Sequence, residues 1–281
     1  MVLSSLPVRR LGMADLNACA ALCADRSGAP ERRSWALMLD AAEAYGVDAP
    51  DGDGLAGSVV LARYGTTLAS AGMMLVASRY SRQGLGRALT EHIIDQAGGS
   101  AMFLTATEPG RPLYAKCGFR PVGRRAKCIG SFARGRDTAT ATRRAGAADM
   151  PVILETDFQA FGEDRRYLLS RLPEFADEVR VAEDARGLAG YAAAWRADEV
   201  AVIGPVVASG EASAAGLIAD LAGHVRGTVR IDLDAERKTL LEWVAEHGLR
   251  QVTVQAFMVR GDWPPPGDRE RIYAPLSVAL S

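Results

Sequence analysis

The chain has 281 residues, of which 48% are hydrophobic and 24% charged, and its net charge at pH 7 is −1. This balance is ordinary for a globular protein and gives no general attraction to nucleic acid or to an anionic membrane. No apolar run approaches the roughly 20 residues that span a bilayer, and residues 1–10 lack the basic start and apolar core of a signal peptide. We therefore expect a cytoplasmic protein with two domains of about 140 residues each.

The first elements are typical of an α/β domain. We expect a strand at 8–11, helices at 13–26 and 31–45, and strands at 58–63 and 68–76, because the apolar residues recur at helical or strand spacing. Glycine, aspartate and proline make residues 47–57 a loop. Cys19 and Cys23 lie four apart on the first helix and are expected to be buried thiols, because the four cysteines and three histidines form no metal-binding cluster.

The stretch from Gly72 to Leu89 contains the strongest local signal. An apolar run ends at Val76, Gly84-x-Gly86 follows, and a helix is expected over 87–97. The first N–H groups of a helix have no internal partner, and glycine lets an anion approach them without meeting a Cβ. Arg79, Arg82 and Arg87 add positive charge. The stretch predicts a pyrophosphate cradle, although one Gly-x-Gly also fits an ordinary strand-to-helix turn.

The following stretch adds a second motif, Leu113-Tyr114-x-x-x-Gly118-Phe119. Residues 102–107 are expected to form a strand, and 111–117 a short helix with Pro112 near its start and Gly118 after its end. A strand or extended arm is expected over 124–132. Residues 133–150 are rich in Arg, Gly, Ala and Thr without periodicity, which is typical of a linker.

The second half repeats the order of the first. We expect a helix opening at 157–169, strands at 178–182, 190–196, 200–207 and 228–234, and helices at 212–225 and 236–246. This order indicates a tandem duplication. The second copy has no Gly-x-Gly. It has Glu211 in the cradle, where a phosphate would be repelled, and Val244 at the position of Tyr114.

Gly84-x-Gly86 followed by Leu113-Tyr114-x-x-x-Gly118-Phe119 closely resembles the GNAT superfamily of acetyl-CoA-dependent N-acetyltransferases. The cradle motif of that family is Gln/Arg-x-x-Gly-x-Gly/Ala, and this chain departs from it at Ser81. The resemblance implies two GNAT-like α/β domains in tandem, each a mixed central sheet flanked by helices. The expected boundaries are a catalytic domain at 1–132, a linker at 133–150 and a degenerate domain at 151–281.

The resemblance also implies a site. Tyr114 would protonate the leaving thiolate, and the backbone of Met74, Leu75 and Val76 would hold acetyl-CoA, the cosubstrate. The turn that would bind its pyrophosphate consists of Ser81, Arg82, Gln83, Gly84, Leu85, Gly86 and Arg87. The acceptor would be a primary amine of a small molecule, attacking directly in a ternary complex without a metal.

Several alternatives stay open. The chain could be a non-catalytic acyl-CoA-binding or regulatory module, whereas a dinucleotide oxidoreductase is disfavoured because Leu89 occupies the third glycine position of its motif. Trp35 and Tyr45 are core residues or walls of an acceptor pocket. The acidic run at residues 48–53 is a solvated loop or attracts a cationic amine. The base is open among water and four carboxylates, Glu108, Asp157, Asp164 and Asp232. The segment from Asp157 to Arg165 also resembles the C-terminal domain of a tandem acetyltransferase subfamily.

Overall fold

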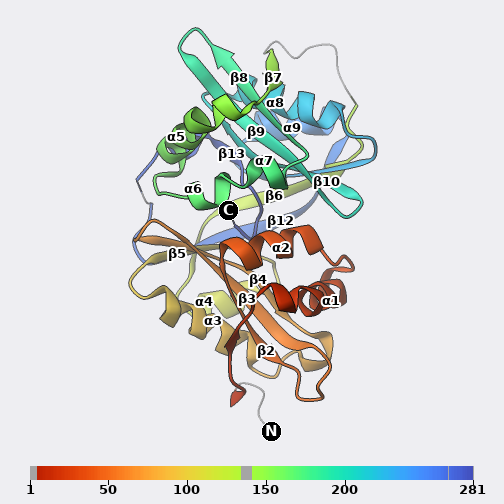
Figure 1. Cartoon of the computed structure of the whole chain (residues 1–281), viewed down its shortest axis with the longest axis vertical. Helices are drawn as coiled ribbons and strands as arrows, with labels where there is room; N and C mark the ends of the chain where they lie inside the picture. The colour runs from red at the N-terminus through yellow and green to blue at the C-terminus, as the bar shows by residue number, and fades with distance from the viewer. Residues whose placement is uncertain (1–4, 134–140, 265, 281) are drawn as a thin grey trace. The chain divides into compact units, whose positions relative to one another are not determined.

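The computed structural model describes residues 5–133, 141–264 and 266–280, which divide into two compact units (Figure 1). Unit 1 comprises the residues up to Val122 together with Phe257–Trp263 and Leu280. Unit 2 comprises Gly123–Ala256 and Pro264–Ala279. The sheets are mixed and flanked by helices, as expected.

Unit 1 contains strands β1 to β5 and helices α1 to α4. Their bounds are β1 Arg9–Arg10, η2 Met13–Asp15, α1 Leu16–Ser27, α2 Arg32–Ala41, β2 Glu43–Asp48, β3 Leu55–Tyr64, β4 Leu68–Val76, η3 Ser78–Tyr80, α3 Leu85–Ala97, β5 Ala101–Ala106 and α4 Arg111–Lys116. The strand order is β1-β2-β3-β4-β5-β12. Nine of the ten residues of β3 are buried, so both of its faces are covered.

The last strand of this order comes from the far end of the chain. β12 spans Leu249–Arg260, and its final residues belong to unit 1. An aromatic cluster holds them there: the ring of Phe103 on β5 lies 5.7 Å from Phe257 and 5.7 Å from Trp263, measured between centroids. Such contacts between aromatic rings stabilise the fold by more than the burial of their apolar area alone would.

β4 is irregular where it approaches the predicted cradle. It pairs with β3 at Val60↔Gly72 and again at Ser58↔Leu75, so Met73 and Met74 together oppose Val59 in a β-bulge. Met73 has φ +45°, and the hydroxyl of Ser58 donates to its carbonyl at 3.1 Å. The parallel ladder between β4 and β5 covers only three pairs, ending at Ser70↔Phe103, although both strands continue. The two strands therefore separate beyond this point.

Unit 2 repeats this arrangement. Its elements are β6 Arg120–Gly130, which begins in unit 1, β7 Thr142–Arg144, η4 Ala147–Asp149, α5 Met150–Phe161, α6 Arg166–Leu169, α7 Leu172–Phe175, β8 Glu178–Asp184, β9 Gly187–Ala197, β10 Val200–Ala208, α8 Glu211–Gly223, β11 Thr228–Asp234, α9 Lys238–Glu246, the first part of β12, η5 Arg269–Arg271 and β13 Ile272–Ala274. The strand order is β6-β11-β10-β9-β8-β7, and β13 pairs with β10. An apolar core lies between this sheet and the helices α8 and α9.

β10 has the same bulge as β4. Its pairing with β9 shifts between Ala194↔Ile203 and Ala192↔Val206, so Gly204 and Pro205 oppose Ala193. The parallel ladder with β11 ends at Ile203↔Ile231. Beyond it, β13 pairs with β10 antiparallel, so in unit 2 a strand occupies the space between the separating strands.

Some expected elements are wrong. The helix expected over 31–45 ends at Ala41, and Glu43–Asp48 form β2, because this segment pairs with both β1 and β3. The helix expected over 157–169 begins earlier, at Met150, and ends at Phe161, because the following Gly162 has a φ of +84°. Part of the expected linker, residues 134–140, lies outside the described residues. The remainder includes β7, which pairs with β8, and η4.

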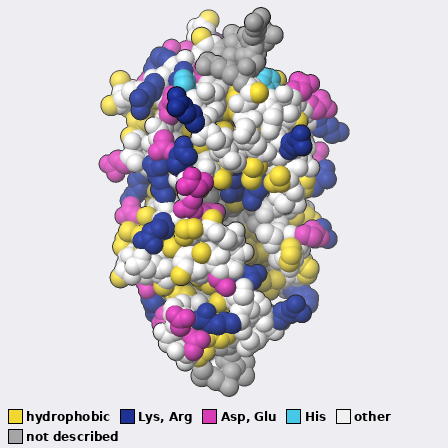
Figure 2. All heavy atoms as spheres, turned by 90° about the vertical axis from the view of Figure 1, so that its right-hand side faces the viewer, with side chains coloured by type: hydrophobic (Ala, Val, Ile, Leu, Met, Phe, Trp, Pro, Cys, Tyr) yellow, Lys and Arg dark blue, Asp and Glu magenta, His cyan; other side chains and the backbone are white. Residues whose placement is uncertain are grey.

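The distribution of charges on the surface is consistent with the near-zero net charge of the sequence. Acidic and basic side chains lie among one another on the face shown in Figure 2. The four cysteines all lie in the described part of the chain and form no disulfide, and Cys19 and Cys23 are buried as expected. In the described part of the chain, no group of His, Cys, Asp and Glu could hold a metal ion. No described helix is long and apolar enough to cross a membrane.

Candidate functional site

A cavity of about 430 Å³ lies in unit 1 where β4 and β5 separate and α3 begins. Most of the residues predicted from the sequence line it: Met74, Val76, Ser81, Arg82, Gly84, Leu85, Gly86, Arg87 and Tyr114. Leu75 and Gln83, also predicted, are not among its lining residues. The fold thus brings the two sequence motifs together at one cavity.

The N-terminus of α3 supplies free backbone donors to this cavity. Gly84 precedes the helix with φ +83°, a conformation that favours glycine, and no described side chain caps the helix. The N–H groups of Arg87 and Ala88 donate to the Gly84 carbonyl, both at 3.1 Å. The preceding N–H groups, of Leu85 and Gly86, have no intrahelical partner and can bind an anion.

Two of the arginines around the turn are already paired. Arg79 forms a 3.2 Å ion pair with Asp51 and donates to the Asp53 carbonyl at 2.6 Å. The hydroxyl of Tyr80 also donates to Asp51, at 2.6 Å. The acidic side chains of the loop are exposed, as expected of a solvated loop, and the carboxylate of Asp51 also holds the η3 segment in place. Arg87 pairs with Glu91 at 2.8 Å. The positive charges expected from Arg79 and Arg87 are therefore each partly balanced by a neighbouring carboxylate.

Tyr114 lies on α4 at the edge of the cavity. Its ring meets that of Phe119 edge-on at 6.0 Å. Burial raises the pKa of the Tyr114 phenol to about 12, and the nearby Cys117 thiol acts in the same direction. The hydroxyl has no hydrogen-bond partner among the described residues. The Tyr114 hydroxyl is therefore protonated at neutral pH, and no described residue accepts its hydrogen bond.

Some lining residues were not predicted as site residues, although one of them, Leu113, begins the second motif. They are Arg26, Tyr80, Thr107, Pro109, Gly110 and Leu113. Thr107 to Gly110 follow β5, and the rule that ligands bind beyond the carboxyl ends of neighbouring parallel strands could have indicated them. Arg26 is in the last turn of α1, and no sequence pattern indicated that this turn reaches the cavity.

The carboxylates considered as a base differ in their surroundings. Asp157 is buried and accepts two hydrogen bonds from Arg165, and Asp232 pairs with Arg230 at 2.8 Å. Asp164 accepts the N–H of Arg166 at 2.8 Å. Glu108 is exposed, and its carboxylate lies 4.0 Å from Arg111. The geometry does not single out a base among them. Trp35 is fully buried in the core, and Tyr45 donates to Glu43 at 2.7 Å.

The corresponding place in unit 2 has different contents. Gly210, before α8, has an extended φ of −169°, and Glu211 begins the helix. Val244, at the position of Tyr114, is fully buried. Tyr273 on β13 is buried, with Arg237 stacked 4.6 Å from its ring centroid. In unit 2, Glu211 therefore stands where unit 1 has the glycine turn, Val244 stands where it has Tyr114, and β13 fills the space that is open beside β4.

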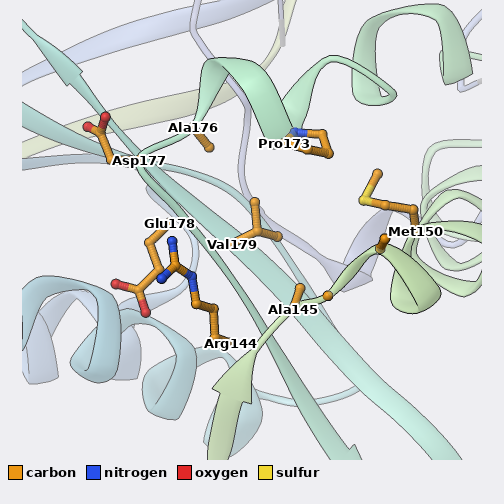
Figure 3. Close-up of a pocket in the computed structure, with 10 residues that line it drawn as sticks. Arg144, Ala145, Met150, Pro173, Ala176, Asp177, Glu178 and Val179 are labelled. Atoms are coloured by element: carbon orange, nitrogen blue, oxygen red, sulfur yellow. The ribbon is translucent and has the colours of Figure 1, made fainter.

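A second cavity, of about 240 Å³, lies elsewhere in unit 2 (Figure 3). It is formed where the segment from β7 to α5 passes the segment from α7 to β8. Met150, Pro173 and Val179 give it apolar walls, and Arg144 and Glu178 lie at one end in Figure 3. None of the catalytic or cofactor-binding residues predicted from the sequence lines this second cavity.

Comparisons with known proteins agree with the duplicated architecture. Two models described as acetyltransferase (GNAT) domains match residues 43–121 and 153–274. The chain is 30% identical over 227 residues to the "uncharacterized N-acetyltransferase YitH" of Bacillus subtilis, covering 76% of this chain and 77% of that protein.

Solved structures share the fold. A putative acetyltransferase from Pyrococcus horikoshii superposes with a TM-score of 0.81 at 20% identity, covering 98% of this chain and 95% of that one. A tandem GNAT protein from the clavulanic acid biosynthesis pathway superposes with a TM-score of 0.65 at 16% identity, covering 92% and 99% of the two chains. The chain therefore belongs to the GNAT family of acetyltransferases and carries two GNAT domains in tandem.

Proposed function

We propose that the N-terminal domain transfers an acetyl group from acetyl-CoA to a primary amine of a small molecule, by direct attack in a ternary complex. One observation carries the proposal: free helix N–H groups, an unpartnered phenol and the separating edge of β4 meet at one cavity in unit 1. The first feature suits a pyrophosphate, the second a leaving thiolate and the third an extended chain.

The duplication within the chain supports the third of these assignments. The two bulges align Met73 and Met74 with Gly204 and Pro205, so Leu75 and Val76 correspond to Val206 and Val207. Val206 and Val207 pair with Ala274 and Ile272 of β13. The edge that accepts an extended peptide in unit 2 corresponds to the edge of β4 along the cavity in unit 1. The pantetheine arm, with its two amides, can pair with backbone in the same way.

The residues of the cavity fit acetyl-CoA, which supplies an acyl group activated as a thioester. The N–H groups of Leu85 and Gly86 would bind its pyrophosphate, and Leu75 and Val76 would hold the arm. Tyr114 keeps its proton at neutral pH, because burial raises its pKa to about 12. When the amine nitrogen forms its bond to the acyl carbon and the carbon–sulfur bond breaks, Tyr114 gives its proton to the departing thiolate. The nitrogen loses one proton to water as the amide forms, and the Tyr114 phenolate regains a proton from water.

Incubation with acetyl-CoA and a panel of primary amines tests the proposal. Release of free CoA thiol, read against a reaction without amine, reports turnover, and mass spectrometry identifies the acetylated product. The reaction without amine corrects for the protein's four cysteines. Binding of acetyl-CoA without turnover of any amine would instead support the acyl-CoA-binding module.

A further inference from the structure

Three arginines line the cavity of unit 1, and they differ in what already balances their charge. Arg87 donates to Glu91 at 2.8 Å. Arg26 and Arg82 have no carboxylate within ion-pair distance among the described residues. Arg82 belongs to the sequence motif, whereas Arg26 comes from α1, some 50 residues earlier in the chain.

Arg26 is held beside the cradle by two neighbouring contacts. The carboxylate of Asp25 accepts the backbone N–H of Ser78 at 2.7 Å, and Nη1 of Arg26 donates to the Ser78 hydroxyl at 2.9 Å. Ser78 begins η3, which connects β4 to the cradle. A guanidinium has five N–H donors, and the contact with Ser78 uses only one of them. The side chain is therefore positioned while most of its donors remain available.

We propose that Arg26 binds the pyrophosphate of the coenzyme A thioester and supplies a side-chain contact in place of the Gln or Arg that Ser81 replaces at the first position of the cradle motif. The inference rests on the proposed function. It assigns a binding role to a residue outside both motifs. Arginine is suited to this role, because its planar fork donates to phosphate oxygens in pairs. The pyrophosphate is the group assigned because Arg26 shares its cavity with Gly84 and Gly86.

The test compares three ligands on the full-length protein: S-acetyl-CoA, S-acetyl-dephospho-CoA, which lacks only the 3′-phosphate, and S-acetylpantetheine, which has no phosphate. Dissociation constants are measured by calorimetry for the wild type and for Arg26→Gln. Arg32→Gln is the matched control, because Arg32 is an exposed arginine of unit 1 that does not line the cavity. It removes the same charge, and hence controls for long-range attraction.

Arg26→Gln should weaken binding of acetyl-CoA and of the dephospho form by the same factor, on the order of tenfold for a charge-assisted contact near the surface. Binding of S-acetylpantetheine should not change, and Arg32→Gln should resemble the wild type with all three ligands.

Three results would overturn the assignment. An equal loss for all three ligands would give Arg26 a structural role through Ser78. A loss confined to acetyl-CoA would assign it to the 3′-phosphate. An unchanged affinity would remove it from the site. A wild-type protein that binds none of the ligands would contradict the proposed function itself, which is a different result from an unaffected Arg26→Gln variant.

Discussion

The carboxylate of Asp157 accepts two 2.7 Å hydrogen bonds from the guanidinium of Arg165, and both side chains are only 1% exposed. The hydroxyl of Tyr191 also donates to Asp157, and the Phe161 ring lies 4.0 Å from the guanidinium carbon. Because Asp157 and Phe161 are on α5 and Tyr191 is on β9, this network joins helix to sheet in unit 2. The residue types of the Asp157–Arg165 segment are therefore explained by this buried network, without a ligand.

Asp157→Asn should destabilise the protein by about 3–5 kcal/mol, because the change leaves the charge of Arg165 buried without its partner. The buried Arg125, a like charge near Arg165, adds to the cost. Urea unfolding measures the difference. Glu155→Gln is the control, since Glu155 is on the same helix and its 3.7 Å pair with Arg166 is exposed, so its loss should cost less than about 1 kcal/mol. Equal losses for the two variants would contradict the importance of burial.

Tyr114→Phe keeps the ring against Phe119 and removes the proton. Turnover should fall by about 10²–10⁴-fold, the usual contribution of general acid catalysis, while acetyl-CoA affinity stays close to wild type. Steady-state kinetics measures the turnover, and calorimetry measures the affinity for acetyl-CoA. Because burial raises the pKa of Tyr114 to about 12, loss of its proton should not lower turnover as the pH rises from 7 to 9. Full turnover of Tyr114→Phe at saturating substrates would make the residue structural.

The two cradle glycines should respond differently to substitution. Gly84 has φ +83°, so a valine there is strained whatever the space, and Gly84→Val should lose both stability and affinity. Gly86 has no such constraint: a Cβ at this position would lie 3.4 Å from Leu113 and 3.7 Å from Val76. Gly86→Val should therefore fold and bind acetyl-CoA at least about tenfold more weakly, because its branches enter the cavity.

Gly86→Ala is the control for this comparison, since its single methyl group makes only ordinary contacts. Thermal unfolding and calorimetry should show wild-type stability for both Gly86 variants. A folded Gly86→Val protein with unchanged affinity would place the cofactor elsewhere.

The sequence predicted the repeated order of elements well, because the strands and helices around the motifs have clear periodicity and clear stops such as Gly118 and Gly248. It did not predict β2, since the segment after Ala41 has good helix formers and becomes a strand only through pairing with β1 and β3. It also missed β13, a three-residue strand whose partner is distant in sequence. At the candidate site, the two local motifs indicated Gly84, Gly86 and Tyr114, and all three line the cavity of unit 1. The position of Arg26 depends on tertiary packing of α1, which no local pattern encodes.

The pairing of β13 with the edge of β10 leads to the last prediction: the full-length chain should bind one acetyl-CoA. In unit 2, β13 occupies the edge of β10 that corresponds to the edge of β4 proposed to hold the cofactor, and Glu211 stands at the start of α8. A pyrophosphate would meet both a filled space and a repelling carboxylate. Calorimetric titration should therefore give about one site per chain. Gly86→Val should weaken that site, and Glu211→Gln should not create another, since β13 remains in place. Two sites per chain, one of them unaffected by Gly86→Val, would show that unit 2 binds the cofactor through other residues.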